Sequence, residues 1–70
     1  MNHSEIKEAL FSRRPVIHTT GGIEIEYDHV SAIIYRLNKN QRLEISAELS
    51  DKHRHSVSIV DPERVRYKEV

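Results

Sequence analysis

The hydrophobic pattern at the start of the chain repeats with the period of a helix. Ile6, Ala9 and Leu10 recur at spacings of three and four residues, which places them on one helical face. Pro15 ends the segment, because proline disfavours helical backbone at the residue before it. The pattern therefore predicts one short helix at about residues 4–12.

Two residues are candidates for the N-cap of this helix. Ser4 has a suitable side chain, and so does Asn2, which is followed three residues later by Glu5, the spacing of a capping box. A helix this short is marginal in water, so it is expected to form only when its apolar face docks against the rest of the fold or a partner.

After the helix, the period changes from a helical repeat to alternation. Residues 16–20 predict a short strand, and Gly21-Gly22 favours a tight turn into the alternating residues 23–28. Residues 29–37 follow without a break and are too rich in Val, Ile and Tyr for a helix to be preferred. These segments predict a first hairpin whose second strand is long.

The cleanest alternation occupies residues 43–49, which predicts a strand with one wet face. The turn before it, residues 38–41, contains no glycine, which disfavours a three-residue loop with a left-handed position. A two- or four-residue loop places Leu37 opposite Arg42. Counting back gives three expected pairs on the core face: Ile34 with Ile45, Ala32 with Ala47, and Val30 with Leu49.

This register leaves Ile33, Tyr35 and Leu37 on the opposite face, so strand 29–37 is apolar on both sides. Such a strand is usually buried, either as the bent strand of a small barrel or beneath the N-terminal helix. The functional interpretation is that the three residues form a partner-binding or self-association surface, because exposed apolar patches mark interaction sites. Phe11 could belong either to the buried arrangement or to the partner-binding surface.

The end of the chain carries the most specific fold signal. VSIVDPERV, residues 57–65, combines a short alternating strand, an Asp-Pro break, a single turn of 3₁₀ helix or type I turn, and an apolar residue that starts a last strand. The order of elements resembles the SH3-like small barrels. The resemblance implies a mainly β fold, a five-stranded SH3-like barrel with a short N-terminal helix, that fills residues 1–70 as one domain.

Two further resemblances concern function. The opening IKEALFSRRPVIHTTGGIEI resembles the Sm-like family, whose bacterial members are RNA chaperones, although the family's second glycine and its acidic-plus-Asn signature are absent. RRPVIH, VSAIIYRLN and VSIVDPERV together resemble short uncharacterised proteins of Gram-positive bacteria and their prophages. That likeness implies an accessory role on a mobile element.

Composition excludes several function classes. Lys and Arg number 11 and Asp and Glu number 11, so no net charge draws the molecule to nucleic acid or an anionic membrane. The chain has no cysteine, and no stretch approaches the ~20 apolar residues of a membrane span, so a cytoplasmic, non-membrane protein is expected.

Metal binding and catalysis have little support. His53 and His55 with Asp51 have ligand chemistry, but they share a short turn with Lys52 and Arg54, so we interpret the segment as a solvated turn. Strand carboxylates alternate outward, and no nucleotide-binding or catalytic motif occurs. We expect no enzyme activity, no catalytic residues, no metal and no cofactor.

The alternative function is binding of single-stranded RNA or DNA. Small basic clusters could contact phosphates while exposed tyrosines stack on bases. The candidate residues are Arg13, Arg14, Lys39, Arg42, Arg64 and Arg66. Acidic residues interleave with them, so we favour a non-enzymatic interaction module that binds a protein of unknown identity or a second copy of itself as a homodimer, through Phe11, Ile33, Tyr35 and Leu37.

Overall fold

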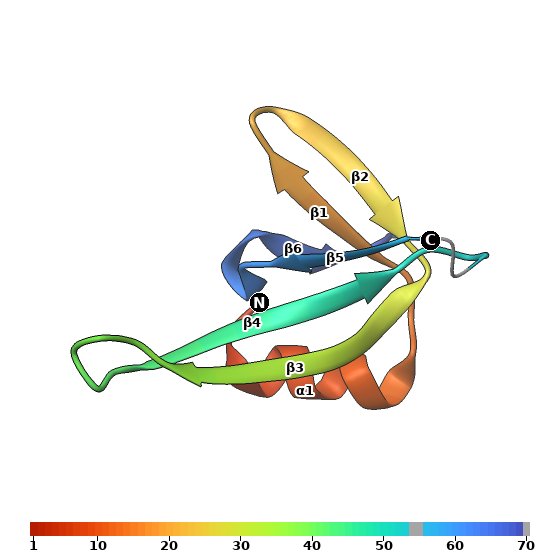
Figure 1. The fold of residues 1–70 in the computed structure, drawn as a ribbon. Coiled ribbons are helices and arrows are strands. Elements are labelled where there is room, and N and C mark those ends of the chain that lie inside the picture. Colours follow the sequence, from red (N-terminus) through yellow and green to blue (C-terminus); the bar gives the residue numbers. More distant parts are fainter. Residues whose placement is uncertain (54–55, 70) are drawn as a thin grey trace.

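The computed structural model describes residues 1–53 and 56–69, and shows a mainly β chain with one short N-terminal helix (Figure 1). This part of the fold prediction is confirmed. The elements are α1 (His3–Ser12), β1 (Val16–Thr20), β2 (Ile23–Tyr27), β3 (His29–Leu37), β4 (Leu43–Ser50), β5 (Val57–Val60), the 3₁₀ turn η1 (Pro62–Arg64) and β6 (Val65–Tyr67).

Helix α1 begins with a capping box at Asn2. The Asn2 side chain accepts a hydrogen bond from the Glu5 amide (2.8 Å), and the Glu5 carboxylate accepts one from the Asn2 amide (2.9 Å). The helix ends at Arg13, whose backbone is left-handed (φ 57°) and whose amide donates to the Ala9 carbonyl (3.1 Å). Both ends of this short helix are therefore satisfied locally, and Asn2 is the N-cap.

The strands form two antiparallel three-stranded sheets, in the orders β2-β1-β6 and β3-β4-β5. The expected long strand is divided at Asp28 into β2 and β3, so the described residues contain six strands where five were predicted. The last strand, β6, pairs with the first, β1, as the resemblance to small barrels implies, but the strands of residues 1–53 and 56–69 form two separate sheets and no closed barrel. The physical reason lies at Asp28, which interrupts the strand that was expected to run through both sheets, so that β2 belongs to one sheet and β3 to the other.

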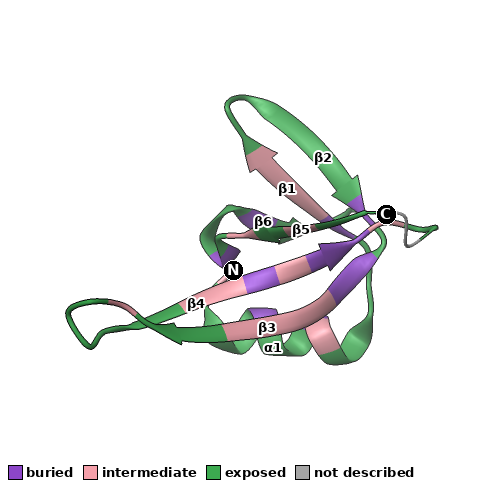
Figure 2. Cartoon of the chain, in the orientation of Figure 1, coloured by how far each residue is buried: buried purple, intermediate pink, exposed green. Residues whose placement is uncertain are grey.

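The core lies where α1 and the two sheets meet (Figure 2). Its largest fully buried side chains are Ile6, Val16, Val30 and Leu49. The Tyr27 hydroxyl is 2.8 Å from Ser58 Oγ and joins β2 of one sheet to β5 of the other. Away from this centre, the β1–β2 and β3–β4 hairpins project in different directions (Figure 1).

The register of the β3–β4 hairpin differs from the predicted one. Val30 does lie opposite Leu49, as predicted. The other predicted pairs, Leu37–Arg42, Ile34–Ile45 and Ala32–Ala47, are wrong by one residue. The observed pairs are Leu37–Leu43, Tyr35–Ile45, Ile33–Ala47 and Ala32–Glu48.

The cause of this shift is a turn that uses glutamine where a glycine is expected. Gln41 adopts a left-handed backbone (φ 61°), and its amide donates to the Asn38 carbonyl (3.0 Å). The Asn38 side chain also accepts from the amides of Asn40 (2.8 Å) and Arg42 (3.1 Å). An irregularity between Val30 and Ala32 then restores the predicted pairing of Val30 with Leu49, at the end of the hairpin away from the turn.

The shift exchanges the faces of β3. Ile33, Tyr35 and Leu37 lie on the same face as Ala47 and the core, whereas the prediction placed them on the opposite face. Ile34 takes the outer face and lies opposite Ser46. The surplus apolar residues of β3 are therefore an extension of the core face beyond the core.

Candidate interaction surface

The core face of the β3–β4 hairpin continues past the point where the helix covers it. Tyr35 lies opposite Ile45, and Leu37 lies opposite Leu43, so four apolar side chains share one side of the hairpin. Leu37 is 66% exposed and Leu43 is 58% exposed. We call these four residues the hairpin face.

The first turn of α1 borders the hairpin face on its inner side. His3 Nε2 lies 2.6 Å from the Tyr35 hydroxyl, and the two rings meet edge to face with centroids 5.6 Å apart. This contact fixes the Tyr35 ring while leaving it half exposed. Helix α1 therefore covers Ile33 and reaches Tyr35, and the apolar pair Leu37 and Leu43 stays open to solvent.

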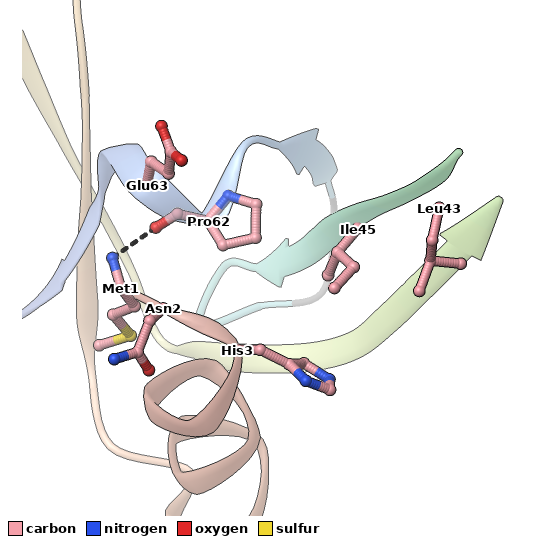
Figure 3. A pocket seen from close by; sticks show the side chains of 7 residues that line it. All are labelled: Met1, Asn2, His3, Leu43, Ile45, Pro62 and Glu63. Carbon is pink, nitrogen blue, oxygen red and sulfur yellow. Dashed lines mark hydrogen bonds between the residues drawn. The ribbon is translucent and has the colours of Figure 1, made fainter. Parts of the chain in front are cut away.

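A groove of about 370 Å³ runs beside the hairpin face, between α1, η1 and β4 (Figure 3). The Met1 nitrogen donates to the carbonyls of Pro62 (2.7 Å) and Val65 (3.0 Å), which holds the start of the chain against η1 and forms one wall. The lining residues are Met1, Asn2, His3, Leu43, Ile45, Pro62 and Glu63. In this groove (Figure 3), β4 supplies the apolar side chains of Leu43 and Ile45, and the polar side chains come from Asn2, His3 and Glu63.

The structure separates the four residues predicted as a partner-binding site. Tyr35 and Leu37 belong to the hairpin face. Ile33 is half-buried against the core, and Phe11 is 81% exposed near the opposite end of α1 from His3. Phe11 thus lies apart from the hairpin face, and only part of the predicted set forms one surface.

Leu43 and Ile45 are the surface residues that the sequence analysis missed. Their alternation with Glu44 and Ser46 correctly placed them on the core face of β4, but the core was expected to extend over them. The available signal was the length of the hairpin, because a ten-residue helix cannot cover both strands to their tips.

The six cationic candidates for nucleic-acid binding do not gather on one surface. Arg13 Nη2 lies 3.0 Å from His29 Nε2, the Arg14 guanidinium lies 3.9 Å from the Tyr67 ring centre, and Arg66 pairs with Glu24 (2.8 Å). Lys39 and Arg42 lie in the β3–β4 turn, far from the α1–β1 junction that carries Arg13 and Arg14 (Figure 1). Arg64 lies in η1.

Other candidate chemistry is sparse. Among residues 1–53 and 56–69, no group of three His, Asp or Glu side chains is placed to hold a metal ion. Of the turn considered for metal binding, Asp51 and His53 are described, whereas Arg54 and His55 lie outside the described residues. In the same part of the chain, no helix has the length and apolar character needed to cross a membrane.

No protein-family model, curated protein or solved structure matches this chain. The arrangement of its own side chains is therefore the basis for assigning a function.

Proposed function

We propose that this chain is a non-enzymatic protein-interaction module that binds through the hairpin face. The observation that carries the proposal is the pair of apolar cross-strand contacts, Tyr35–Ile45 and Leu37–Leu43, on the core side of the hairpin beyond the helix. Contiguous exposed apolar residues of this kind mark interaction surfaces. Their place on two paired strands gives the surface a fixed shape.

The exposed leucines make this surface energetically significant. Fully burying a leucine side chain contributes roughly 1.5–3 kcal/mol, so covering Leu37 and Leu43, each about two-thirds exposed, contributes roughly 2–4 kcal/mol. A small domain has only about 5–15 kcal/mol of net stability. The free energy gained when a protein surface covers both leucines is therefore a substantial fraction of the free energy of unfolding of such a domain.

A protein partner suits this surface better than nucleic acid. The hairpin face is apolar, whereas recognition of a single strand relies on clustered cations beside exposed aromatic rings. A second copy of the chain is the first partner to test, because its hairpin face supplies a matching apolar patch for an isologous dimer.

The strand arrangement supports an open form of the SH3-like small barrel as the fold. β2 and β3 are separated by Asp28 alone, and η1 stands between β5 and β6, where SH3-like barrels have a 3₁₀ turn. An experimental structure that keeps β6 paired with β1 and the same two strand orders would support this relationship.

Site-specific photocrosslinking in the native cells tests the proposed function. A photoreactive amino acid at Leu37 is expected to give a protein adduct, whereas the same group at Glu8, which is exposed on α1, gives none. An adduct of twice the chain mass would identify a second copy, and light scattering would then show a dimer. Crosslinks to nucleic acid alone, or equal yields at both positions, would contradict the proposal.

A further inference from the structure

The edge of β4 that faces β5 is paired with a strand along only half of its length, beyond which η1 packs near it. β5 pairs with residues 47–50 of β4, and residues 43–46 have no strand beside them on this side within 1–53 and 56–69. β5 ends at Val60, after which Pro62 starts the η1 turn. We call residues 43–46 the uncovered edge.

Backbone hydrogen bonds show which groups point toward the uncovered edge. The Ser50 carbonyl accepts from the Asp28 amide on the side of β3, and the Asp51 amide donates to the Ser56 carbonyl on the side of β5. In an antiparallel strand, successive residues direct their polar groups to opposite edges. Counting back from Asp51 in steps of two, Ile45 and Leu43 direct their amides and carbonyls toward the uncovered edge.

Hollows lie on both sides of this edge. On the helix side is the groove described above, which Leu43, Ile45 and Pro62 line. On the other side is a second hollow of about 370 Å³, lined by Glu44, Ile45, Ser46, Ile59, Val60 and Asp61. Ile45 lines both hollows, so one lies on each side of the edge toward which its backbone amide and carbonyl point. We call the two hollows together the slot.

The two sides of the slot differ in chemistry. The helix side offers apolar contacts from Leu43, Ile45 and Pro62. The other side carries the carboxylates of Glu44 and Asp61. Glu44 accepts a long hydrogen bond from Asn38 Nδ2 (3.3 Å), and one oxygen of Asp61 accepts from the Glu63 amide (3.0 Å). An added strand presents alternate side chains to the two sides, so a segment that alternates apolar and basic residues is complementary to the slot.

We propose that the uncovered edge binds an extended peptide segment of a partner protein as an added β-strand, antiparallel to β4 and in line with β5. Its backbone pairs with Leu43 and Ile45, its apolar side chains enter the helix-side groove, and its Lys or Arg side chains face Glu44 and Asp61. This mode of recognition takes affinity from main-chain hydrogen bonds and specificity from alternate side chains. The inference rests on the proposed function and names the chemistry of the partner.

The probe that tests this inference is the labelled peptide acetyl-Lys-Val-Lys-Leu-Lys-amide, measured by fluorescence polarisation. In the proposed arrangement, the Val and Leu amides face β4 and the Lys amides face away. Methylating the Val and Leu nitrogens is therefore expected to weaken binding about tenfold or more, because each methyl removes a donor and blocks the approach of the strand. Methylating the Lys nitrogens leaves binding unchanged. Equal effects of the two methylation patterns would overturn the inference.

Charge substitutions on the protein give an independent readout. Glu44→Lys is expected to weaken binding of the Lys-containing peptide about tenfold, whereas Glu8→Lys, an identical change on α1, leaves it unchanged. Amide NMR shifts caused by the peptide are expected in residues 43–46 and 59–63. Shifts confined to other residues, or equal binding to a peptide with Glu in place of Lys, would contradict the proposal.

The failure of this inference and of the proposed function are distinguishable. If the peptide does not bind while the photoreactive group at Leu37 still crosslinks to protein, the strand-addition site is wrong and the hairpin face remains the interaction surface. If neither experiment detects a protein or peptide, both proposals fail.

Discussion

The guanidinium of Arg13 lies 3.0 Å from Nε2 of His29 and joins the end of α1 to the start of β3. Because a guanidinium only donates hydrogen bonds, Nε2 is the acceptor. The proton therefore lies on Nδ1, which donates to the Asp28 carboxylate (2.8 Å). His29 is 5% exposed, so the loss of Arg13 would leave a buried acceptor without this donor.

Substitutions at Arg13 separate this hydrogen bond from backbone strain. Arg13→Ala is expected to lower the free energy of unfolding by about 1–3 kcal/mol, since His29 loses a charged donor. Arg13→Gly is expected to lower it less, by about 1 kcal/mol, because glycine adopts the left-handed backbone without steric conflict. Urea denaturation measures both. Equal losses would show that the left-handed backbone at this position carries no strain.

The left-handed backbone at Gln41 leads to a second prediction about stability. Gln41→Gly is expected to raise the free energy of unfolding by about 0.5–1 kcal/mol, because it relieves the steric cost at φ 61°. Lys39→Gly, in the same turn but with an ordinary backbone, is the control. It should lower the stability, since glycine adds entropy to the unfolded chain. A loss of stability in the Gln41 variant would argue for a different turn and a different register.

The local elements of this fold were predictable because their signals are local. The helix follows from the apolar spacing around Ile6, the first hairpin from Gly21-Gly22, and the 3₁₀ turn from Pro62. The hairpin register was not predictable, because it depends on Gln41 adopting a backbone conformation that usually indicates glycine. The division at Asp28, which leaves two separate sheets, depends on how distant segments pack.

The candidate surface was predictable only in part for the same reason. The surplus of apolar residues in strand 29–37 identified Tyr35 and Leu37 as anomalous. Their partners Leu43 and Ile45 were assigned to the core because they share the core face of β4, and alternation alone does not show where the covering helix ends. Phe11 shares their apolar character, but sequence spacing does not determine which end of the sheet a helix residue reaches.

Docking of α1 is expected to depend on one side chain. Ile6 is fully buried, so Ile6→Ala should lower the free energy of unfolding by about 2–4 kcal/mol through lost contacts and a residual cavity. Leu10→Ala removes a similar volume from a half-buried position on the same helix and should have a smaller effect. Thermal unfolding followed by circular dichroism measures both. A larger effect at Leu10 would mean that α1 turns a different face toward the core.

Two tyrosines give opposite predictions for removal of a hydroxyl. The Tyr27 hydroxyl is bonded to Ser58, so Tyr27→Phe should lower the free energy of unfolding by about 1 kcal/mol. The buried Tyr67 hydroxyl has no hydrogen-bond partner among residues 1–53 and 56–69, so Tyr67→Phe should raise it by about 1 kcal/mol. The same ring remains in both variants, which makes each the control for the other. A loss at Tyr67 equal to that at Tyr27 would indicate a partner for its hydroxyl.

The interaction-module proposal also predicts how the protein behaves with labelled single-stranded RNA. Arg13 is engaged with His29 and Arg66 with Glu24, and the cations of the β3–β4 turn stand apart from both. Few phosphates can then be neutralised at once, so any binding should be weak, with a slope of log affinity against log salt of about −1 or less steep. A slope near −3 would require about four simultaneous phosphate contacts. If Lys39→Glu and Arg42→Glu then abolished that binding, the β3–β4 turn would be a nucleic-acid surface and the alternative function would replace the one proposed here.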